Sequence, residues 1–272
     1  MIFETTTIHY NAEVRPAYYR MGVKCGEAFQ NASPGQFVML AAGDGYDPLL
    51  PRPFSIHRVR MPEEKVEGVE ILYKKVGRGT SRMSLLKRGD PIRILGPLGN
   101  GFHIPERPGR IFVVAGGIGV APLFFLVEKL LTRGTDPNAV YVFIGGRTRD
   151  DILCFQEFNR MGVHVVIATD DGSAGDPCLV SQPVEIAAEE NPPDLIFSCG
   201  PKGMLDCVAR MAERLDIACQ VSIETDMACG IGACMGCAVN GSEKDRYFHV
   251  CTDGPVFDSR RLDWESKTCS TP

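Results

Sequence analysis

Four cysteines near the end of this 272-residue chain place the strongest constraint on how it folds. Cys229, Cys234 and Cys237 are separated by four residues and then by two, and Cys251 follows. Thiols so closely spaced can meet at one centre only if the backbone loops tightly around it. Glycine gives that freedom, because it reaches positive φ at little cost. The glycines of this loop are Gly230, Gly232 and Gly236.

The spacing predicts a 2Fe-2S cluster held by thiolates. A C-x4-C-x2-C run followed by a distant cysteine is the pattern of plant-type ferredoxins. Small residues in the loop also let backbone N–H groups approach the cluster sulfurs, which tunes the reduction potential. The expected cluster ligands are Cys229, Cys234, Cys237 and Cys251.

Two other interpretations of the cysteines stay open. Structural zinc usually has two short Cys-x-x-Cys pairs, whereas this chain has one such pair and a cysteine further upstream. The cysteines could also be incidental, since the chain has eleven. Four thiols within 23 residues, interspersed with glycine, argue against that. A zinc-stabilised interaction module would be colourless, which separates it from an iron-sulfur protein.

Charge and composition exclude several partners. The net charge of −5 and the pI near 5.6 leave no basic surplus to neutralise nucleic acid or an anionic membrane. The N-terminus does not resemble a secretory signal, and an odd number of cysteines suits reduced thiols better than a disulfide framework. We therefore expect a cytoplasmic protein that binds neither nucleic acid nor membrane.

One uncharged segment, residues 111–127, could be mistaken for a membrane span. It is shorter than the roughly 20 residues that a span needs. It also contains glycines and a proline. A buried strand, a glycine turn and the start of a helix explain it better.

The first part of the chain, residues 1–107, predicts a small antiparallel β-barrel. Its β-branched and aromatic runs are separated by proline and glycine clusters, with only one short helix expected at 81–86.

Three features of this part could bind a ligand. Arg52 beside Pro53 offers a rigidly placed guanidinium, suited to a pyrophosphate. The turn at 77–80 exposes backbone N–H groups to an anion, although a plain turn with a threonine cap fits equally well. The glycine-rich loop 96–102 could pack on a flat ring.

The next part, residues 108–222, alternates strands and helices, which predicts a parallel sheet covered on both faces. Ligands of such sheets bind at the carboxyl ends of the strands. Gly116-Gly117-Ile-Gly119 is a strand-to-helix turn of the dinucleotide-binding sort, although Pro122 stands where a third glycine would fall. Cys199 ends another strand and could touch a nicotinamide ring, or be a buried thiol.

In this order the motifs resemble the ferredoxin-NADP reductase superfamily over nearly the whole chain. Within it, segments 227–237 and 249–257 most resemble the electron-transfer subunits of type B dihydroorotate dehydrogenases. The resemblance implies a multi-domain chain with an antiparallel β-barrel flavin domain, an α/β parallel-sheet nucleotide domain and a small C-terminal 2Fe-2S domain. The expected boundaries are 1–107, 108–222 and 223–272.

The resemblance also implies the cofactors FAD and NAD. FAD is expected at Arg52, Pro53, Phe54, Ser55, Leu72, Tyr73, Lys74, Gly79 and Thr80. The superfamily often has tyrosine where Phe54 stands, so ring stacking is kept and a hydroxyl contact is lost. NAD is expected at Gly116, Gly117, Gly119 and Cys199. Arg147 and Arg149 follow a strand where relatives bind the adenosine ribose, so NADP stays open.

By the same resemblance, a partner subunit with FMN oxidises dihydroorotate to orotate in pyrimidine biosynthesis. Electrons then pass through the cluster and FAD to NAD, in an expected heterotetramer of two copies of each subunit. The flavin must lie between the others, because it exchanges either one or two electrons. The five histidines are scattered, so no catalytic residue is expected here. The alternative is the small subunit of a bifurcating NADH-dependent ferredoxin-NADP reductase or a sulfhydrogenase diaphorase.

Overall fold

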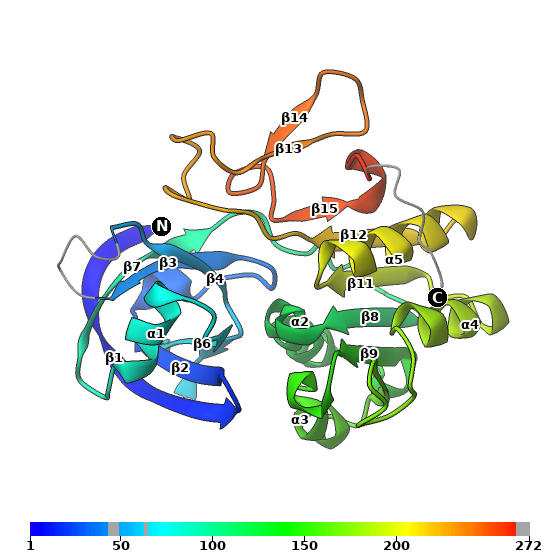
Figure 1. The fold of residues 1–272 in the computed structure, drawn as a ribbon, viewed down its shortest axis with the longest axis horizontal. Coiled ribbons are helices and arrows are strands. Elements are labelled where there is room, and N and C mark those ends of the chain that lie inside the picture. The colour runs from blue at the N-terminus through cyan, green and yellow to red at the C-terminus, as the bar shows by residue number, and fades with distance from the viewer. Residues whose placement is uncertain (43–48, 63–64, 265–272) are drawn as a thin grey trace. The chain divides into compact units, whose positions relative to one another are not determined.

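The computed structural model describes residues 1–42, 49–62 and 65–264 (Figure 1). These residues form two compact units. The first unit comprises Met1–Gly101, Glu224–Ala238 and His249–Pro255, and so holds all four cysteines of the predicted cluster. The second comprises Phe102–Ile223, Val239–Phe248 and the chain from Val256 onward. The three-part division expected from sequence stays a prediction.

The first unit is built on a seven-stranded antiparallel sheet that curls into a half-barrel (Figure 1). Strand β1 pairs with β7 through its first half and with β2 through its second. Register shifts within the β1–β2 pair bend the ribbon, as β-bulges do. The strand order is β4-β3-β7-β1-β2-β6-β5. The elements are β1 (Ile2–Arg15), β2 (Tyr18–Lys24), η1 (Glu27–Phe29), β3 (Phe37–Ala42), β4 (Arg52–Ser55), β5 (Arg58–Arg60), β6 (Gly68–Lys74), α1 (Arg78–Leu85) and β7 (Pro91–Leu98).

Strand β7 lies inside this sheet, between β3 and β1, although the sequence predicted a loop over part of it. Its prolines at 91 and 97 argue against an inner strand. Its alternating burial reveals the strand: Ile92, Ile94 and Leu98 are buried while the intervening residues are partly exposed. The period of two therefore outweighs the proline signal here.

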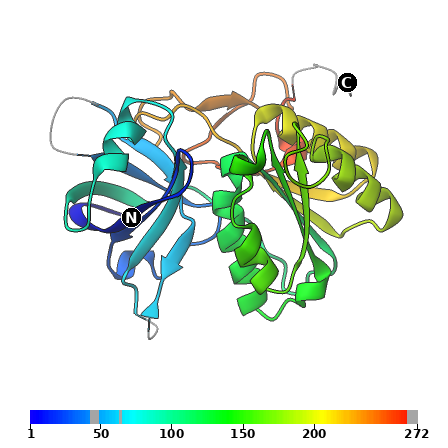
Figure 2. The same ribbon diagram turned by 60° about the horizontal axis from the view of Figure 1, so that its bottom comes forward.

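The second unit is built on a six-stranded sheet of order β10-β9-β8-β11-β12-β15. Five strands are parallel, as predicted, and the sixth is antiparallel to β12. Helices cover both faces, with α2 and α5 on opposite sides (Figure 2). The elements are β8 (Ile111–Gly116), η3 (Gly117–Gly119), α2 (Val120–Thr132), η4 (Pro137–Ala139), β9 (Val140–Gly146), η5 (Arg149–Asp151), α3 (Phe155–Arg160), β10 (His164–Thr169), α4 (Ser181–Glu190), β11 (Leu195–Cys199), α5 (Lys202–Arg214), β12 (Ala218–Ser222), β15 (Val256–Asp258) and η6 (Ser259–Arg261).

The uncharged segment 111–127 forms β8, η3 and the start of α2, as expected from its glycines. Every residue of β8 is buried, which is usual for a strand inside a parallel sheet. Among the described residues, no helix has both the length and the hydropathy to cross a membrane. The cysteine-rich region adds β13 (Ala238–Asn240) and β14 (Tyr247–His249), which pair in a two-stranded sheet.

A substitution at Phe143 tests the core assigned to the second unit. Phe143 lies on β9, is 1% exposed, and packs on Phe112 with ring centroids 5.0 Å apart. We expect Phe143→Ala to destabilise this unit by about 3–5 kcal/mol, because it loses buried area and leaves a cavity. Urea unfolding measures the change. Ile186→Ala, at an exposed position on α4, is the control. Equal stability of the two variants would contradict the assigned core.

Candidate cluster, flavin and nicotinamide sites

The cysteine loop, residues 229–237, is shaped by residues with positive φ. Gly230 and Gly232 have φ of 74° and 79°, and Met235 has φ of 60°. The backbone N–H groups of Ile231 and Cys234 donate to Cys229 Sγ at 3.5 and 3.4 Å. Such N–H···S contacts stabilise thiolates and tune an iron-sulfur cluster.

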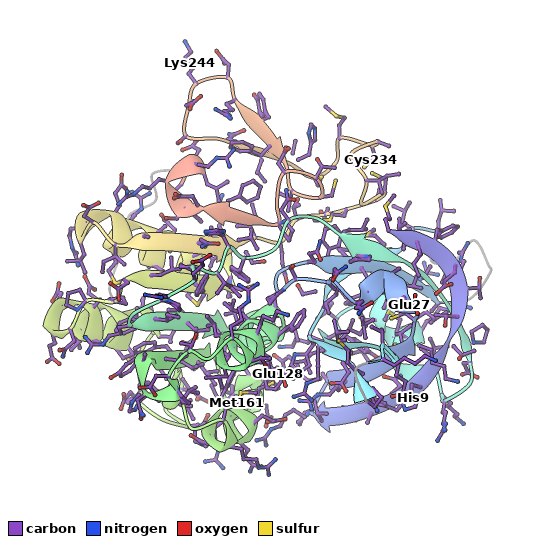
Figure 3. The ribbon with its side chains drawn as sticks, turned by 180° about the vertical axis from the view of Figure 1, so that it is seen from behind. His9, Glu27, Glu128, Met161, Cys234 and Lys244 are labelled. Carbon is purple, nitrogen blue, oxygen red and sulfur yellow. The ribbon has the colours of Figure 1, made fainter. Side chains whose placement is uncertain are left out.

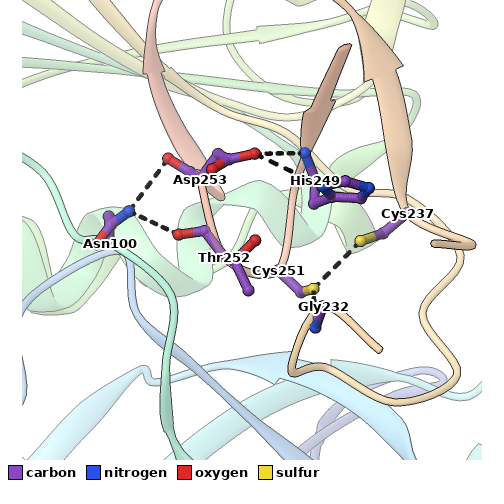
Figure 4. Close-up of polar contacts among 7 residues, drawn as sticks. All are labelled: Asn100, Gly232, Cys237, His249, Cys251, Thr252 and Asp253. Atoms are coloured by element: carbon purple, nitrogen blue, oxygen red, sulfur yellow. Dashed lines mark hydrogen bonds and ion pairs between the residues drawn. The ribbon is translucent and has the colours of Figure 1, made fainter. Parts of the chain in front are cut away.

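Cys251 comes from a separate turn, residues 249–253, that meets the cysteine loop (Figure 4). The N–H of Gly232 donates to Cys251 Sγ at 3.1 Å, and the Cys237 thiol donates to the same sulfur at 3.3 Å. Cys237 and Cys251 are buried, whereas Cys234 is exposed at the surface (Figure 3).

The donor chemistry of these residues fits an iron-sulfur cluster, since several thiols carry backbone N–H donors. The structure brings Cys237 and Cys251 together as a thiol pair, a contact that two thiolates would not make. Within the described ranges, no group of three or more His, Cys, Asp or Glu side chains is arranged to hold a metal ion. The four-cysteine ligand set therefore stays a prediction.

Two of these thiols differ in acidity. Burial raises the pKa of Cys229, but the N–H groups of Ile231 and Cys234 outweigh it and lower that pKa to about 7. Burial and then the Cys237 thiol raise the pKa of Cys251 to about 12, despite the Gly232 N–H. Cys229 is thus the readier thiolate, and thiolates are the form that binds metal.

The cysteine loop rests on the sheet of the first unit at Gly230. A Cβ atom there would lie 2.7 Å from Met39 Cγ and 3.1 Å from Leu98 Cδ1. No side chain fits, so only glycine permits this approach. Met39 on β3 pairs in turn with Pro53 on β4, within the predicted flavin motif.

The predicted flavin residues come together from two strands and a helix. Arg52, Pro53, Phe54 and Ser55 form β4 and are all partly exposed. The Arg52 side chain lies over Gly79, where a Cβ atom would be 3.3 Å from its Nε. Its guanidinium donates to the Leu50 carbonyl at 2.6 Å. A cation thus lies beside the N-terminal turn of α1, which suits a phosphate group.

Tyr73 supports this site from inside the sheet. It is 1% exposed, and its ring meets Phe54 edge-on at 5.8 Å and stacks on Tyr19 at 5.5 Å. Burial raises its pKa, although the hydrogen bond to Asn11 acts the other way. Leu72 is also buried, and the Lys74 ammonium lies over the ring of Tyr18. Tyr73 therefore positions Phe54 and presents little ring surface of its own.

Thr80 and Asn11 fix the two ends of helix α1. The Thr80 hydroxyl oxygen accepts the N–H groups of Val76 and Gly77 at 2.9 and 3.1 Å, so this hydroxyl closes the turn. At the other end, Asn11 Nδ2 donates to the carbonyls of Met83 and Leu86 at 2.8 and 3.0 Å. Asn11 Oδ1 accepts the Tyr73 hydroxyl at 3.1 Å. Sequence analysis missed Asn11, because nothing local marks an asparagine within a strand.

The predicted nicotinamide residues also meet. A Cβ atom at Gly119 would lie 2.2 Å from the Cys199 carbonyl oxygen, and one at Gly116 would lie 2.6 Å from Pro201 Cδ. The ends of the neighbouring strands β8 and β11 are thus packed backbone to backbone. Gly117 has φ of 52° and open space beside it, so it supplies the turn. Cys199 is buried.

The two arginines after β9 differ in what they can bind. The guanidinium of Arg149 donates twice to the Ser173 carbonyl, at 3.0 and 2.8 Å, and its backbone N–H donates to the Ser173 hydroxyl. Arg147 is exposed; its backbone N–H donates to the Asp151 carboxylate and its carbonyl accepts the Asp171 N–H. Arg149 therefore anchors the loop after β10, and its donors are already engaged.

Two known domain families match parts of this chain. Residues 224–263 match the iron-sulfur cluster binding domain of dihydroorotate dehydrogenase B, and residues 113–210 match the oxidoreductase NAD-binding domain. The electron transfer subunit of dihydroorotate dehydrogenase B (NAD(+)) from Desulforamulus reducens is 39% identical, over 93% of this chain and 95% of that protein. The subunit of the same name from Fusobacterium nucleatum is 34% identical, over 94% and 97%.

Solved structures show the same fold. An NADH-dependent reduced ferredoxin-NADP oxidoreductase, studied for flavin-based electron bifurcation, aligns with a TM-score of 0.82 at 26% identity, over 96% of this chain and 90% of that one. A ferredoxin NADP+ reductase from Neisseria gonorrhoeae with bound FAD and NADP aligns with a TM-score of 0.65 at 15% identity, over 78% and 91%. At that identity the likeness shows the fold alone.

A substitution at Gly119 tests whether the glycine turn 116–119 needs its tight packing. In Gly119→Ala the new methyl group meets the Cys199 carbonyl, so the turn must shift. We expect a loss of about 1–3 kcal/mol of stability, as for other overpacked sites, together with weaker NADH binding. Thermal unfolding and NADH titration measure both. The matched control is Gly203→Ala, where a methyl group meets nothing within 4 Å. Equal behaviour of the two variants would argue against the tight packing of this turn.

Asn11 tests the support of the flavin motif. Asn11→Ala removes three hydrogen bonds and leaves the Met83 and Leu86 carbonyls without their side-chain donor. Unmade buried hydrogen bonds cost about 1–3 kcal/mol each, so we expect α1 to loosen and FAD to be lost during purification. Tyr73→Phe removes only one of the three bonds and should retain more FAD. Full FAD content in Asn11→Ala would refute the role given to α1.

Proposed function

Because the chain belongs to the family of electron-transfer subunits of dihydroorotate dehydrogenase B, we propose that it carries electrons from a catalytic partner subunit to NAD. An iron-sulfur cluster exchanges single electrons, a nicotinamide exchanges hydride, and a flavin does both. The matched cluster-binding and NAD-binding regions supply the two ends of such a path.

One observation carries the proposal: the cysteine loop and the flavin motif share one sheet. Gly230, next to Cys229, rests on Met39, and Met39 pairs with Pro53 in the motif. Electron transfer needs a short path through packed protein. The close approach at Gly230 provides one inside a single unit.

Several of the proposed site residues have neighbours that suit the roles given to them. The N–H groups of Ile231, Gly232 and Cys234 stabilise thiolates for a 2Fe-2S cluster. Arg52 and the turn of α1 hold the FAD pyrophosphate, and Phe54, supported by Tyr73, lies against the flavin. The glycine turn at 116–119 receives the NAD pyrophosphate, with Cys199 beside it. The proposed cluster ligands are Cys229, Cys234, Cys237 and Cys251.

We infer a catalytic partner subunit, because the sequence does not account for the oxidation of dihydroorotate. Its five histidines are scattered along the sequence, and the relatives are named as electron transfer subunits, which implies a separate catalytic subunit. The oxidation of dihydroorotate to orotate, a step of pyrimidine biosynthesis, therefore belongs to an FMN-containing partner subunit. We place the assembly in the cytoplasm, as a heterotetramer of two copies of each subunit.

A second candidate is the corresponding subunit of a bifurcating ferredoxin-NADP oxidoreductase, since that structure aligns over 96% of this chain. Sequence favours the first assignment. The identity to that structure is 26%, against 39% and 34% for the two dihydroorotate dehydrogenase subunits.

An anaerobic titration with NADH tests the proposal. We expect the flavin absorption band of the purified protein to bleach, and a rhombic 2Fe-2S signal to appear in the EPR spectrum. Cys251→Ser should remove the EPR signal and keep the FAD content, because position 251 lies outside the flavin motif. A colourless protein that contains zinc would overturn the proposal. Orotate formation after addition of an FMN-containing dihydroorotate dehydrogenase subunit then separates the two candidates.

A further inference from the structure

The glycine-rich loop that follows β7 contacts the turn that carries Cys251. The side-chain amide of Asn100 donates to the carbonyls of Thr252 and Asp253 at 2.9 and 3.1 Å (Figure 4). Its backbone N–H donates to the Gly254 carbonyl at 2.6 Å. One residue thus binds three successive carbonyl groups just after the predicted fourth cluster ligand.

We propose that Asn100 is a positioning residue for Cys251, which it holds against the cysteine loop so that the cluster site keeps its shape. The inference rests on the proposed function, because it concerns the same cluster. It goes further in naming a residue that lies 151 positions before Cys251 in sequence and is not itself a ligand.

The turn around Cys251 closes on itself. The His249 carbonyl accepts the N–H groups of Thr252 and Asp253 at 3.0 and 2.8 Å. The Asp253 carboxylate accepts the His249 N–H at 2.7 Å. These bonds give the turn its form. They do not fix where it lies on the sheet, which is what the Asn100 bonds add.

The loop that presents Asn100 is itself fixed. Gln36 Nε2 donates to the Gly99 carbonyl at 2.8 Å, and Gln36 Oε1 accepts the Ser33 N–H at 2.8 Å. Gly99 has φ of 73°, and a Cβ atom there would lie 2.6 Å from Pro255 Cδ and 2.9 Å from Phe37 Cε1. The backbone can approach the cysteine turn this closely only with glycine at 99.

The position of Cys251 matters because its sulfur accepts two hydrogen bonds from the other cysteine segment. Gly232 N–H and the Cys237 thiol both reach it, at 3.1 and 3.3 Å. A shift of the turn by even 1 Å would break the first bond by ordinary distance limits. Outer residues of this kind typically change metal affinity about 10–100-fold when they are mutated.

The test is the stability and spectrum of the cluster in variants of the full chain, purified anaerobically with its cofactors. We expect Asn100→Ala to release iron to a chelator about tenfold or more faster than wild type, and to shift or broaden the EPR signal. Asn100→Asp should release it faster still, because a carboxylate facing two carbonyls cannot donate and repels them.

Two controls separate positioning from general destabilisation. Asn138→Ala removes an exposed amide whose side-chain partner within the described ranges is Asp136, and should leave both the cluster and FAD unchanged. Asn11→Ala should lose FAD and keep its rate of iron release, which is the reverse of the pattern for Asn100.

Four outcomes decide the inference. Loss of iron in Asn100→Ala with wild-type FAD content supports it. Iron release and an EPR spectrum identical to wild type would overturn it and leave the proposed function intact, and parallel loss of iron and FAD would show a merely structural role. A wild-type protein without an iron-sulfur signal would overturn the proposed function and the inference together.

Discussion

The contact of the cysteine segments with the antiparallel sheet is the constraint on which the rest of the first unit depends. Neither the loop 229–237 nor the turn 249–253 has a hydrophobic core of its own. Each is held because a glycine allows the backbone to approach: Gly230 against β3 and β7, and Gly99 against Pro255. Backbone N–H groups can then point at sulfur with little motion, which a flexible loop would not maintain. The sheet that holds the cluster segments also carries the flavin motif on β4.

In the second unit, glycines likewise allow a close approach of the backbone, here at the proposed site for a nucleotide. Gly116 and Gly119 are needed because the backbone and side chains after β11 lie against them, and Gly117 is needed for its positive φ. A tight turn and close packing are both roles that glycines have in dinucleotide-binding turns. The shape of the proposed nucleotide site is therefore a product of how tightly two neighbouring strand ends are packed.

Features of the fold that depend on residues close together in the sequence were predicted well. The alternation of strands and helices predicted the parallel sheet correctly, whereas the motifs at Arg52, Gly116 and Cys229, noted from residue type and spacing and interpreted through the family resemblance, stay predictions. Features with distant causes were missed. Asn11 and Asn100 act on residues 62 or more positions away, so no local pattern marks them. Strand β7 was hidden by its prolines, and β15 by its length of three residues. The identity of the substrate came from family likeness alone.

The position of β15 in the sequence determines when, during synthesis, the sheet of the second unit can be completed. Strand β15 follows Cys251 by only five residues and pairs with β12 at the edge of the nucleotide sheet. Chains emerge from the ribosome N-terminus first, so all four cysteines have been made before this strand can join. Until then β12 presents an open edge, which is a template for pairing with other chains. The nascent sheet therefore keeps this open edge until β15, which follows Cys251, has left the ribosome.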